Sequence, residues 1–397
     1  MKRKRKRKIG IVIGSRANYA SIKSVARELK KNRNIELHIY AGASAILDKY
    51  GKVEDIIEKD GFHIDERFYM LVEGETPETM AMSTGLGIIR LVDIFQNQRP
   101  DIVITVGDRF ETMATAISAA YLNIFLAHTM GGEVSGTVDE SIRHAVTKFA
   151  HIHFPANKRA SDRIIKMGEE PKNVFVTGCP RIDIVKEVIE ESRKSNNFNE
   201  DNFWKKYKGV GGNFSLKKEK FLLVLQHPVT TEFHKNREHI NETLMALNEL
   251  KIPTIMLWPN ADAGSDEISK GIRTFREEYK PDWFHIFKNL PMEVFVQLMD
   301  MCKVLIGNTS SAIREGAIVG VPVVNIGTRQ QGRCRGKNVF DVNYNKNEIV
   351  NAIKKQIEHG KYKPDYIYGD GKAGKKIAKI LSEIDLNKVD IQKRILI

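Results

Sequence analysis

Residues 9–31, IGIVIGSRANYASIKSVARELKK, decide the fold class of this chain. A short apolar run that ends in glycine comes first, and a stretch with apolar side chains at helical spacing follows it. This pattern predicts a buried strand, a tight turn and a helix. No G-x-G-x-x-G follows the strand and the chain holds no GxxxxGK[ST], so it lacks the signatures of a dinucleotide site and of a P-loop.

The same alternation recurs along the chain. Examples are DIVITVGD (101–108) and IFLAHT (124–129) in the first half, and FLLVLQHP (221–228) and VPVVNIG (321–327) in the second. Short continuous apolar strands between helices indicate parallel sheets that are covered on both faces. The sequence therefore predicts an α/β protein with two Rossmann-like, doubly wound parallel-sheet domains that face each other across a cleft.

A polar stretch from about Lys186 to Lys220 separates the two series of strands. We expect these divisions of the chain: a disordered basic tail over 1–8, an N-terminal domain over 9–180, a C-terminal domain over 181–370, and a helix within 371–397 that crosses back to the first domain.

Composition and charge exclude several classes of protein. Of the 397 residues, 42% are hydrophobic and 28% charged, which is typical of a globular protein. The formal net charge is +13, but the run Lys2 to Lys8 supplies seven positive charges, so we expect only this tail to be able to bind nucleic acid or acidic lipid. No apolar run is long enough to cross a bilayer and no secretory signal follows the tail, which predicts a cytoplasmic protein without membrane contact.

Metal and cofactor sites are not expected. Cys179, Cys302 and Cys334 are far apart and form no ligand pattern, so we interpret them as reduced thiols. His151 and His153 alternate along a predicted strand and could share a face, but the sequence places no third ligand beside them. Packing or substrate positioning is therefore the preferred interpretation of the pair.

Polar residues follow directly after most predicted strands. Ligands of open parallel sheets bind beyond the carboxyl ends of the strands, so these residues are the candidates for a site. They are Arg16 and Asn18, Asp108 and Arg109, His128, Glu133 and Asp139 in the first domain, and His227, Asn260, Asp262, Asn308 to Ser311 and Arg329 in the second.

Two features of this set have alternative interpretations. Thr309, Ser310 and Ser311 open a predicted helix, where they could bind a diphosphate or simply cap the helix. Glu315 in the same helix could bind a ribose or lie at the surface. In the first domain, Arg143 is a candidate partner for Asp139 or Glu140, and His144 is expected on a helix face.

Seven motifs in order resemble those of the hydrolysing UDP-N-acetylglucosamine 2-epimerases, including the epimerase half of the bifunctional animal enzyme of sialic acid synthesis. The resemblance runs from about Ile9 to Asp385. The motifs are VGDRFE, HTMGGEVSGTVDESIRHA, HPVTTE, PNADAG, GNTSSAIREGA, GVPVVNIGTRQQGR and IYGDG.

The resemblance implies the GT-B fold, with a second domain that binds the nucleotide, and a reaction without a cofactor. UDP-N-acetylglucosamine and water would give N-acetylmannosamine and UDP through a glycal. That chemistry needs a base and an acid on opposite faces of the sugar, and charges that hold the leaving diphosphate.

The implied site residues follow from the matched motifs. Asp108, Asp139, Glu133 and His227 would be catalytic, without an assignment of base and acid. The nucleotide and substrate would be bound by Arg16, Arg109, Thr309, Ser310, Ser311, Glu315, Arg329, Asn260 and Asp262. We expect a UDP-HexNAc substrate and a homo-oligomer, either a dimer or a tetramer.

Departures from the family pattern leave the substrate open. Met130 stands where relatives carry a catalytic glutamate, and Asn18 where they tend to carry an acid. Either Glu133 replaces the missing acid, or the substrate differs, or the activity is weak. The alternatives are therefore a hydrolysing UDP-N,N'-diacetylbacillosamine 2-epimerase of legionaminic acid synthesis, a non-hydrolysing epimerase, and an inactive protein that binds nucleotide sugars or nucleic acid.

Overall fold

The computed structural model describes residues 5–74, 76–135, 138–195, 198–259 and 264–394. The chain divides into two compact units. Unit 1 consists of residues 1–133, 139–184 and 369–397, and unit 2 consists of residues 134–138 and 185–368. None of the helices in the described ranges is long and apolar enough to span a bilayer.

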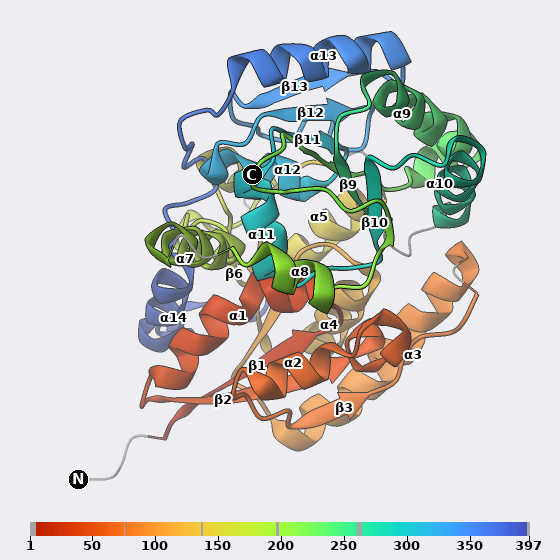
Figure 1. Cartoon of the computed structure of the whole chain (residues 1–397). Coiled ribbons are helices and arrows are strands. Elements are labelled where there is room, and N and C mark those ends of the chain that lie inside the picture. Colours follow the sequence, from red (N-terminus) through yellow and green to blue (C-terminus); the bar gives the residue numbers. More distant parts are fainter. Residues whose placement is uncertain (1–4, 75, 136–137, 196–197, 260–263, 395–397) are drawn as a thin grey trace. The chain divides into compact units, whose positions relative to one another are not determined.

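Unit 1 is built on a parallel sheet with the strand order β3-β2-β1-β4-β5-β6 (Figure 1). Its strands are β1 (Arg7–Ile13), β2 (Ile35–Gly42), β3 (Glu66–Phe68), β4 (Ile102–Val106), β5 (Phe125–Thr129) and β6 (Ile152–Phe154). Its helices are α1 (Arg16–Lys31), α2 (Val53–Lys59), α3 (Pro77–Gln98), α4 (Phe110–Tyr121), α5 (Asp139–Phe149), α6 (Lys158–Lys166) and α14 (Ala373–Glu383), and α7 (Pro180–Ser195) starts in this unit.

Unit 2 repeats the design with the order β13-β12-β11-β8-β9-β10-β7, in which only the β7–β10 pairing between described residues is antiparallel. Its strands are β7 (Val210–Gly211), β8 (Leu222–Leu225), β9 (Thr254–Leu257), β10 (Phe284–Phe287), β11 (Val304–Gly307), β12 (Val323–Ile326) and β13 (Val339–Val342). Its helices are α8 (Glu200–Lys206), α9 (Asn236–Leu250), α10 (Ser265–Tyr279), α11 (Met292–Met301), α12 (Ser310–Val319) and α13 (Lys346–His359).

Both sheets reverse their strand order at one point, between β1 and β4 in unit 1 and between β8 and β11 in unit 2. Such a reversal is the place where doubly wound sheets bind ligands, because the connections leave a crevice between the two strand ends. The central strands are buried on both faces, which explains their continuous apolar runs.

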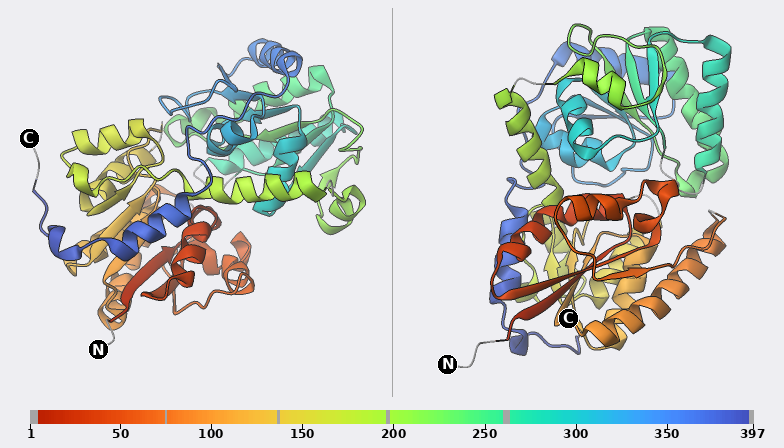
Figure 2. Two further views of the ribbon diagram at one scale, coloured as in Figure 1. Left: turned by 90° about the vertical axis from the view of Figure 1, so that its left-hand side faces the viewer. Right: turned by 60° about the horizontal axis from the view of Figure 1, so that its bottom comes forward.

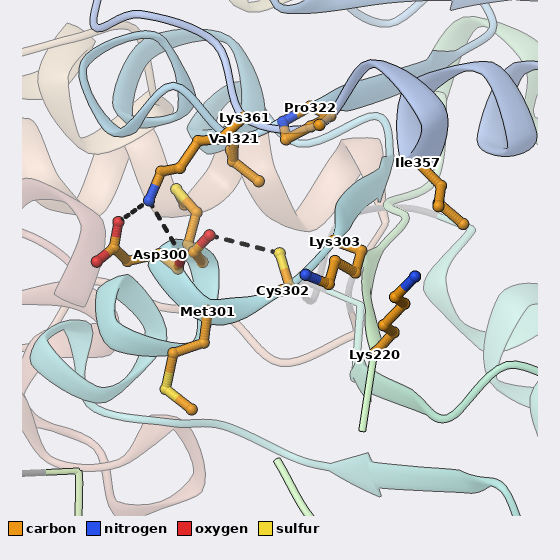
Figure 3. A pocket seen from close by; sticks show the side chains of 11 residues that line it. Lys220, Asp300, Met301, Cys302, Lys303, Val321, Pro322, Ile357 and Lys361 are labelled. Atoms are coloured by element: carbon orange, nitrogen blue, oxygen red, sulfur yellow. Dashed lines mark hydrogen bonds and ion pairs between the residues drawn. The ribbon is translucent and has the colours of Figure 1, made fainter. Parts of the chain in front are cut away.

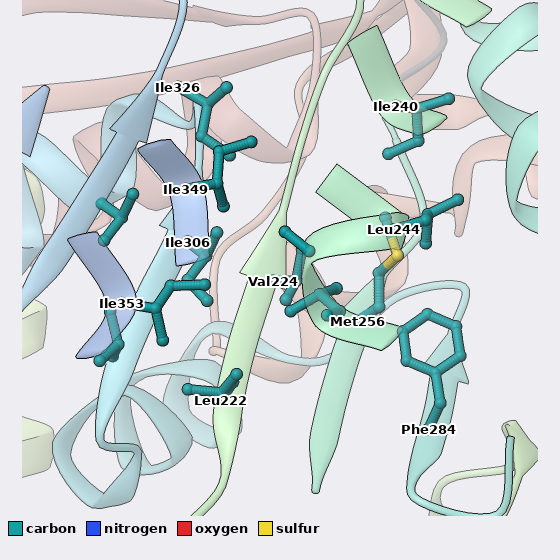
Figure 4. Close-up of a cluster of buried hydrophobic side chains, with 14 of the residues drawn as sticks. Leu222, Val224, Ile240, Leu244, Met256, Phe284, Ile306, Ile326, Ile349 and Ile353 are labelled. Atoms are coloured by element: carbon teal, nitrogen blue, oxygen red, sulfur yellow. The ribbon is translucent and has the colours of Figure 1, made fainter. Parts of the chain in front are cut away.

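The core of unit 2 lies between its sheet and the helices α9, α10 and α13 (Figure 4). Leu222, Val224 and Ile306 from the strands meet Ile240, Leu244 and Ile353 from the helices, and all of these side chains are almost completely buried. Full burial of such a side chain contributes about 1.5–3 kcal/mol. This packing holds the carboxyl ends of β8 and β11 at a fixed spacing.

β1 begins at Arg7, so the last two residues of the segment 1–8, predicted to be a disordered tail, belong to the sheet. Arg7 donates from Nη1 to the carbonyl of Leu381 (2.5 Å) and from Nη2 to that of Ile384 (2.7 Å). Its guanidinium is therefore used at the end of α14, while Lys8 pairs through its backbone with Asp101. Figure 2 shows α14, in blue, lying beside α1, in red.

Candidate active site

The carboxyl ends of β1 and β4 in unit 1 are joined by the side chain of Asn18. Its Oδ1 accepts from the Gly14 amide (3.2 Å) and its Nδ2 donates to the Val106 carbonyl (3.3 Å). An acid could accept from Gly14 but could not donate to Val106. The asparagine that departs from the family pattern thus has a structural role here, and Arg16 begins α1 beside it.

Arg143 in α5 connects three acidic positions of unit 1. The side chain is 1% exposed, and its Nε donates to Asp108 Oδ2 at 3.0 Å while Nη2 donates to the same oxygen. Nη1 donates to the Glu133 carbonyl (3.0 Å) and to Glu140 Oε2 (2.9 Å). Because a buried guanidinium needs such partners, Arg143 fixes the ends of β4 and β5 against α5.

This arrangement goes beyond the sequence interpretation of Arg143. Its pairing with Glu140 was a candidate, but the partner Asp108 lies 35 residues away in the chain and was not foreseen. Asp139 begins α5, one turn before Arg143, and Glu133 is 4% exposed at the turn after β5. The predicted acids Asp108, Glu133 and Asp139 therefore all adjoin one buried arginine or its helix.

His151, His153 and His144 of unit 1 each contact different partners. His151 Nδ1 accepts from the Leu126 amide (3.1 Å) and its Nε2 lies 3.0 Å from the Ile391 carbonyl, whereas His153 Nε2 lies 3.1 Å from Glu169 Oε2. Among the residues whose structure is described, no group of three or more potential metal ligands is present. The geometry supports packing for this pair, and His144 contacts Glu140 Oε1 at 2.8 Å along the face of α5.

His128 lies at the end of β5 and is completely buried. Its Nε2 is 2.7 Å from the Gly107 carbonyl, and burial lowers the pKa of the imidazole to about 3. The side chain is thus neutral near pH 7 and acts as a link between β5 and the turn after β4.

Met130 follows β5 in the left-handed region, with φ of 64°, and is 8% exposed. This backbone conformation is uncommon for a residue other than glycine and costs about 1 kcal/mol or more. Neighbouring Gly132 also has a positive φ, and a side chain there would collide with the Ala160 carbonyl. The turn that bears the departure from the family pattern is therefore tightly constrained.

In unit 2 the carboxyl ends of β8 and β11 are occupied by His227 and Asn308, both buried. Asn308 Oδ1 accepts from the His227 amide (2.7 Å) and Nδ2 donates to the His227 carbonyl (2.8 Å). The carbonyl of Asn308 accepts from Arg329 Nη1 (3.2 Å) and Gln330 Nε2 (2.8 Å). This network includes the predicted residues His227 and Arg329.

The N-terminus of α12 opens at the same place. Thr309 is its N-cap and accepts from the Ser311 amide at 3.3 Å, while Ser310 Oγ accepts from Arg314 Nη2 at 3.1 Å. Ser311 Oγ donates to Glu315 Oε1 (3.2 Å). Glu315 is 1% exposed, so the alternative of a surface glutamate is wrong.

Other predicted residues differ in their surroundings. Arg109 is the N-cap residue of α4 and its Nε lies 3.2 Å from Glu111 Oε1. Asn260 and Asp262 lie outside the described residues. The sequence did not predict two further contacts. One is the hydrogen bond from Gln330 to the Asn308 carbonyl, and the other is the parallel stack of the Tyr344 and His239 rings, whose centroids are 3.5 Å apart.

A pocket of about 170 Å³ lies at the opposite ends of the unit 2 strands (Figure 3). Its wall includes residues that come just before three strands. Lys303 and Pro322 directly precede β11 and β12, and Lys220 lies two residues before the start of β8. Asp300 beside it is bound by Lys361 and, at 3.1 Å, by Arg193. The pocket is therefore remote from the strand ends at which doubly wound sheets bind ligands.

Polar groups lie at both points of strand reversal, where doubly wound sheets bind ligands, and comparison with known proteins identifies the family. Residues 27–382 match the family model of UDP-N-acetylglucosamine 2-epimerase. The chain belongs to the UDP-N-acetylglucosamine 2-epimerase family.

Individual relatives cover almost the whole chain. The hydrolysing UDP-N,N'-diacetylbacillosamine 2-epimerase of Legionella pneumophila is 32% identical over 98% of both chains, and the UDP-N-acetylglucosamine 2-epimerase of Neisseria meningitidis is 29% identical over 98% of both. The crystal structure of the Neisseria meningitidis UDP-GlcNAc 2-epimerase bound to UDP-GlcNAc superposes with a TM-score of 0.79, at 17% identity, covering 94% of this chain and 99% of that one. The family and the GT-B fold class expected from the sequence are thus confirmed.

Proposed function

We propose that this member of the 2-epimerase family is a hydrolysing UDP-N-acetylglucosamine 2-epimerase, which supplies N-acetylmannosamine for sialic or related nonulosonic acid synthesis. The observation that carries the proposal is the group of acids around Arg143, because the reaction needs carboxylates fixed at a strand end. The hydrolysing Legionella relative and the UDP-GlcNAc-bound Neisseria structure support it.

The reaction divides into elimination and addition. The bond from carbon 1 to the diphosphate oxygen breaks, UDP leaves with the electron pair, and a carboxylate removes the proton at carbon 2 to give the glycal. Water then adds its oxygen to carbon 1, and carbon 2 receives a proton on the other face. Asp108, Glu133 and Asp139 are the candidates for base and acid, with the two roles unassigned between them.

The diphosphate is assigned to unit 2. The N-terminus of α12 offers backbone amides and a partial positive charge, to which Thr309, Ser310 and Ser311 add hydroxyls. His227 and Arg329 are held beside it through Asn308, and buried Glu315 is the candidate ribose ligand. Arg16 and Arg109 of unit 1 are the further candidates for substrate binding.

The second candidate function is hydrolysis of UDP-N,N'-diacetylbacillosamine, the activity named for the Legionella relative. Met130 is the observation that raises this alternative, because a buried methionine stands where the family resemblance implies a catalytic glutamate, and methionine cannot transfer a proton. The non-hydrolysing reaction and an inactive binding protein are the remaining alternatives.

Incubation of the protein with each UDP-sugar in deuterated water, followed by NMR, distinguishes these functions. We expect release of UDP together with N-acetylmannosamine that carries deuterium at carbon 2. Turnover of the bacillosamine derivative alone would support the second function. Epimerised UDP-sugar without free UDP, or no turnover of either substrate, would contradict both hydrolysing functions.

We also propose that the chain forms a homo-oligomer through α3. The side chains of Met82, Leu86 and Ile89 follow one face of this helix and are 61%, 43% and 62% exposed. Gly85 between them has open space where a side chain would be, which allows another helix to approach closely. A second copy of the chain presents the same apolar face and is the occupant that we propose.

A further inference from the structure

Asn308 lies directly after β11, is fully buried, and makes both of its side-chain hydrogen bonds to the backbone of one residue, His227. β8 and β11 are neighbouring strands at the reversal point of unit 2, and their backbone pairing ends with Leu225 opposite Gly307. The Asn308 side chain thus continues this pairing beyond the ends of the strands, where the backbone ladder has stopped.

The geometry requires an amide side chain. A primary amide places a donor and an acceptor side by side on one short planar group, whereas an ionised aspartate offers acceptors alone. Gly307 allows the close approach of the strands, since a side chain there would collide with the Leu225 carbonyl. At this spacing the short asparagine side chain reaches both backbone groups of His227.

The carbonyl of Asn308 connects the same residue to the loop after β12. Arg329 Nη1 and Gln330 Nε2 both donate to it, and Gln330 is 2% exposed. Asn308 therefore fixes His227 and Arg329 relative to each other, and both adjoin the N-terminus of α12.

We infer that Asn308 is a positioning residue: by binding both backbone groups of His227, it fixes the place from which the imidazole reaches the diphosphate. This inference rests on the proposed function, which assigns the diphosphate to the N-terminus of α12. Asn308 acts through His227, so its contribution disappears when the imidazole is absent.

The test is a double-mutant cycle with Asn308→Asp and His227→Ala, using the UDP-sugar that the wild-type enzyme hydrolyses. Asn308→Asp keeps the acceptor for the His227 amide and loses the donor to its carbonyl. We expect kcat to fall by about 10- to 100-fold, because small misplacements of a catalytic group have effects of this size. The double variant should be no slower than His227→Ala alone, since the two changes remove the same interaction.

Asn338→Asp is the matched control. Asn338 is also buried in unit 2 and donates from Nδ2 to a backbone carbonyl, that of Val321 at 2.9 Å, but at the opposite end of β12. The variant Asn338→Asp should have a lower free energy of unfolding than the wild type and an unchanged kcat. Asn308→Ser serves as a second variant if Asn308→Asp does not fold. A kcat of Asn308→Asp within 2-fold of wild type, or losses that multiply in the double variant, would overturn the inference.

A second readout separates this inference from the proposed function. The same cycle is measured for UDP binding by calorimetry, which needs no turnover. If the wild type hydrolyses no UDP-sugar but binds UDP, the proposed function fails, while non-additive losses of UDP affinity still support the role of Asn308. Additive losses, or a wild type that does not bind UDP, would refute the inference.

Discussion

At the residue scale, Arg143 and His128 of unit 1 show two ways in which a basic side chain is buried. Arg143 keeps its charge because carboxylates of Asp108 and Glu140 and a backbone carbonyl surround it. His128 instead stays neutral, since burial disfavours its imidazolium form and lowers its pKa to about 3. Arg143 thus holds two carboxylates in place as a charged group, whereas His128 contributes to the fold as a neutral one.

The prediction for His128 concerns stability against pH. Its pKa is lowered in the folded state from 6.5 to about 3, so the unfolded chain takes up the proton first as the pH falls. The stabilising contribution is complete above about pH 6.5 and is lost as the pH falls toward 3. Between pH 7.5 and 5, the free energy of unfolding falls by about 2 kcal/mol through this residue.

Over the same pH interval, the free energy of unfolding of His128→Gln should therefore fall by about 2 kcal/mol less than that of the wild type, because glutamine does not titrate. Urea denaturation at the two pH values measures this difference. His63→Gln, at an exposed position, is the control and should follow the wild type. Equal pH dependence of wild type and His128→Gln would contradict the assignment of a neutral buried imidazole.

At the element scale, α14 is held at both ends by charges of complementary sign. Asp183 accepts from the amides of Ala373 (2.9 Å) and Gly374 (2.7 Å) at the N-terminus, and Arg7 donates to two carbonyls at the C-terminus. A helix dipole favours this arrangement. A Cβ at Gly374 would lie 2.7 Å from the Ser24 backbone, so the helix packs closely on α1.

Asp183→Asn should destabilise unit 1 by about 1–3 kcal/mol, because it replaces two charge-assisted hydrogen bonds with at most one neutral acceptor. We expect faster hydrogen exchange over residues 373–384, measured by mass spectrometry. Asp390→Asn changes an exposed acid in the same segment and is the control. Unchanged exchange in Asp183→Asn would show that packing on α1 alone holds the helix.

The elements also show how far the sequence could predict this structure. Buried strands such as β4 and β11 were predictable, because both faces are covered and the whole strand is apolar. β13 was missed since it is only partly buried and carries no apolar run, and α13 after it was missed as well. Strand-end residues indicated where a site would lie, but the contacts of Arg143 and Asn308 join positions 35 and 81 residues apart, and no local pattern encodes them.

At the scale of the whole molecule, α3 carries an exposed apolar face that is not covered by other described residues of the same chain. Met82, Leu86 and Ile89 repeat at helical spacing and face solvent, whereas an amphipathic helix on a sheet normally turns such a stripe inward. The opposite face of α3 is already buried through Leu91, Ile94 and Phe95. Association of two copies would bury the exposed side chains of Met82, Leu86 and Ile89.

Leu86→Glu and Ile89→Glu should weaken this association. A carboxylate buried without a partner costs about 2 kcal/mol or more, so the dissociation constant should rise at least ~30-fold. Analytical ultracentrifugation over a range of concentrations measures it. Phe340→Glu replaces an apolar side chain that is 43% exposed in unit 2 and should leave the assembly intact. A wild type that stays monomeric at all concentrations, or variants that associate as strongly as wild type, would show that the face of α3 does not bind a second copy.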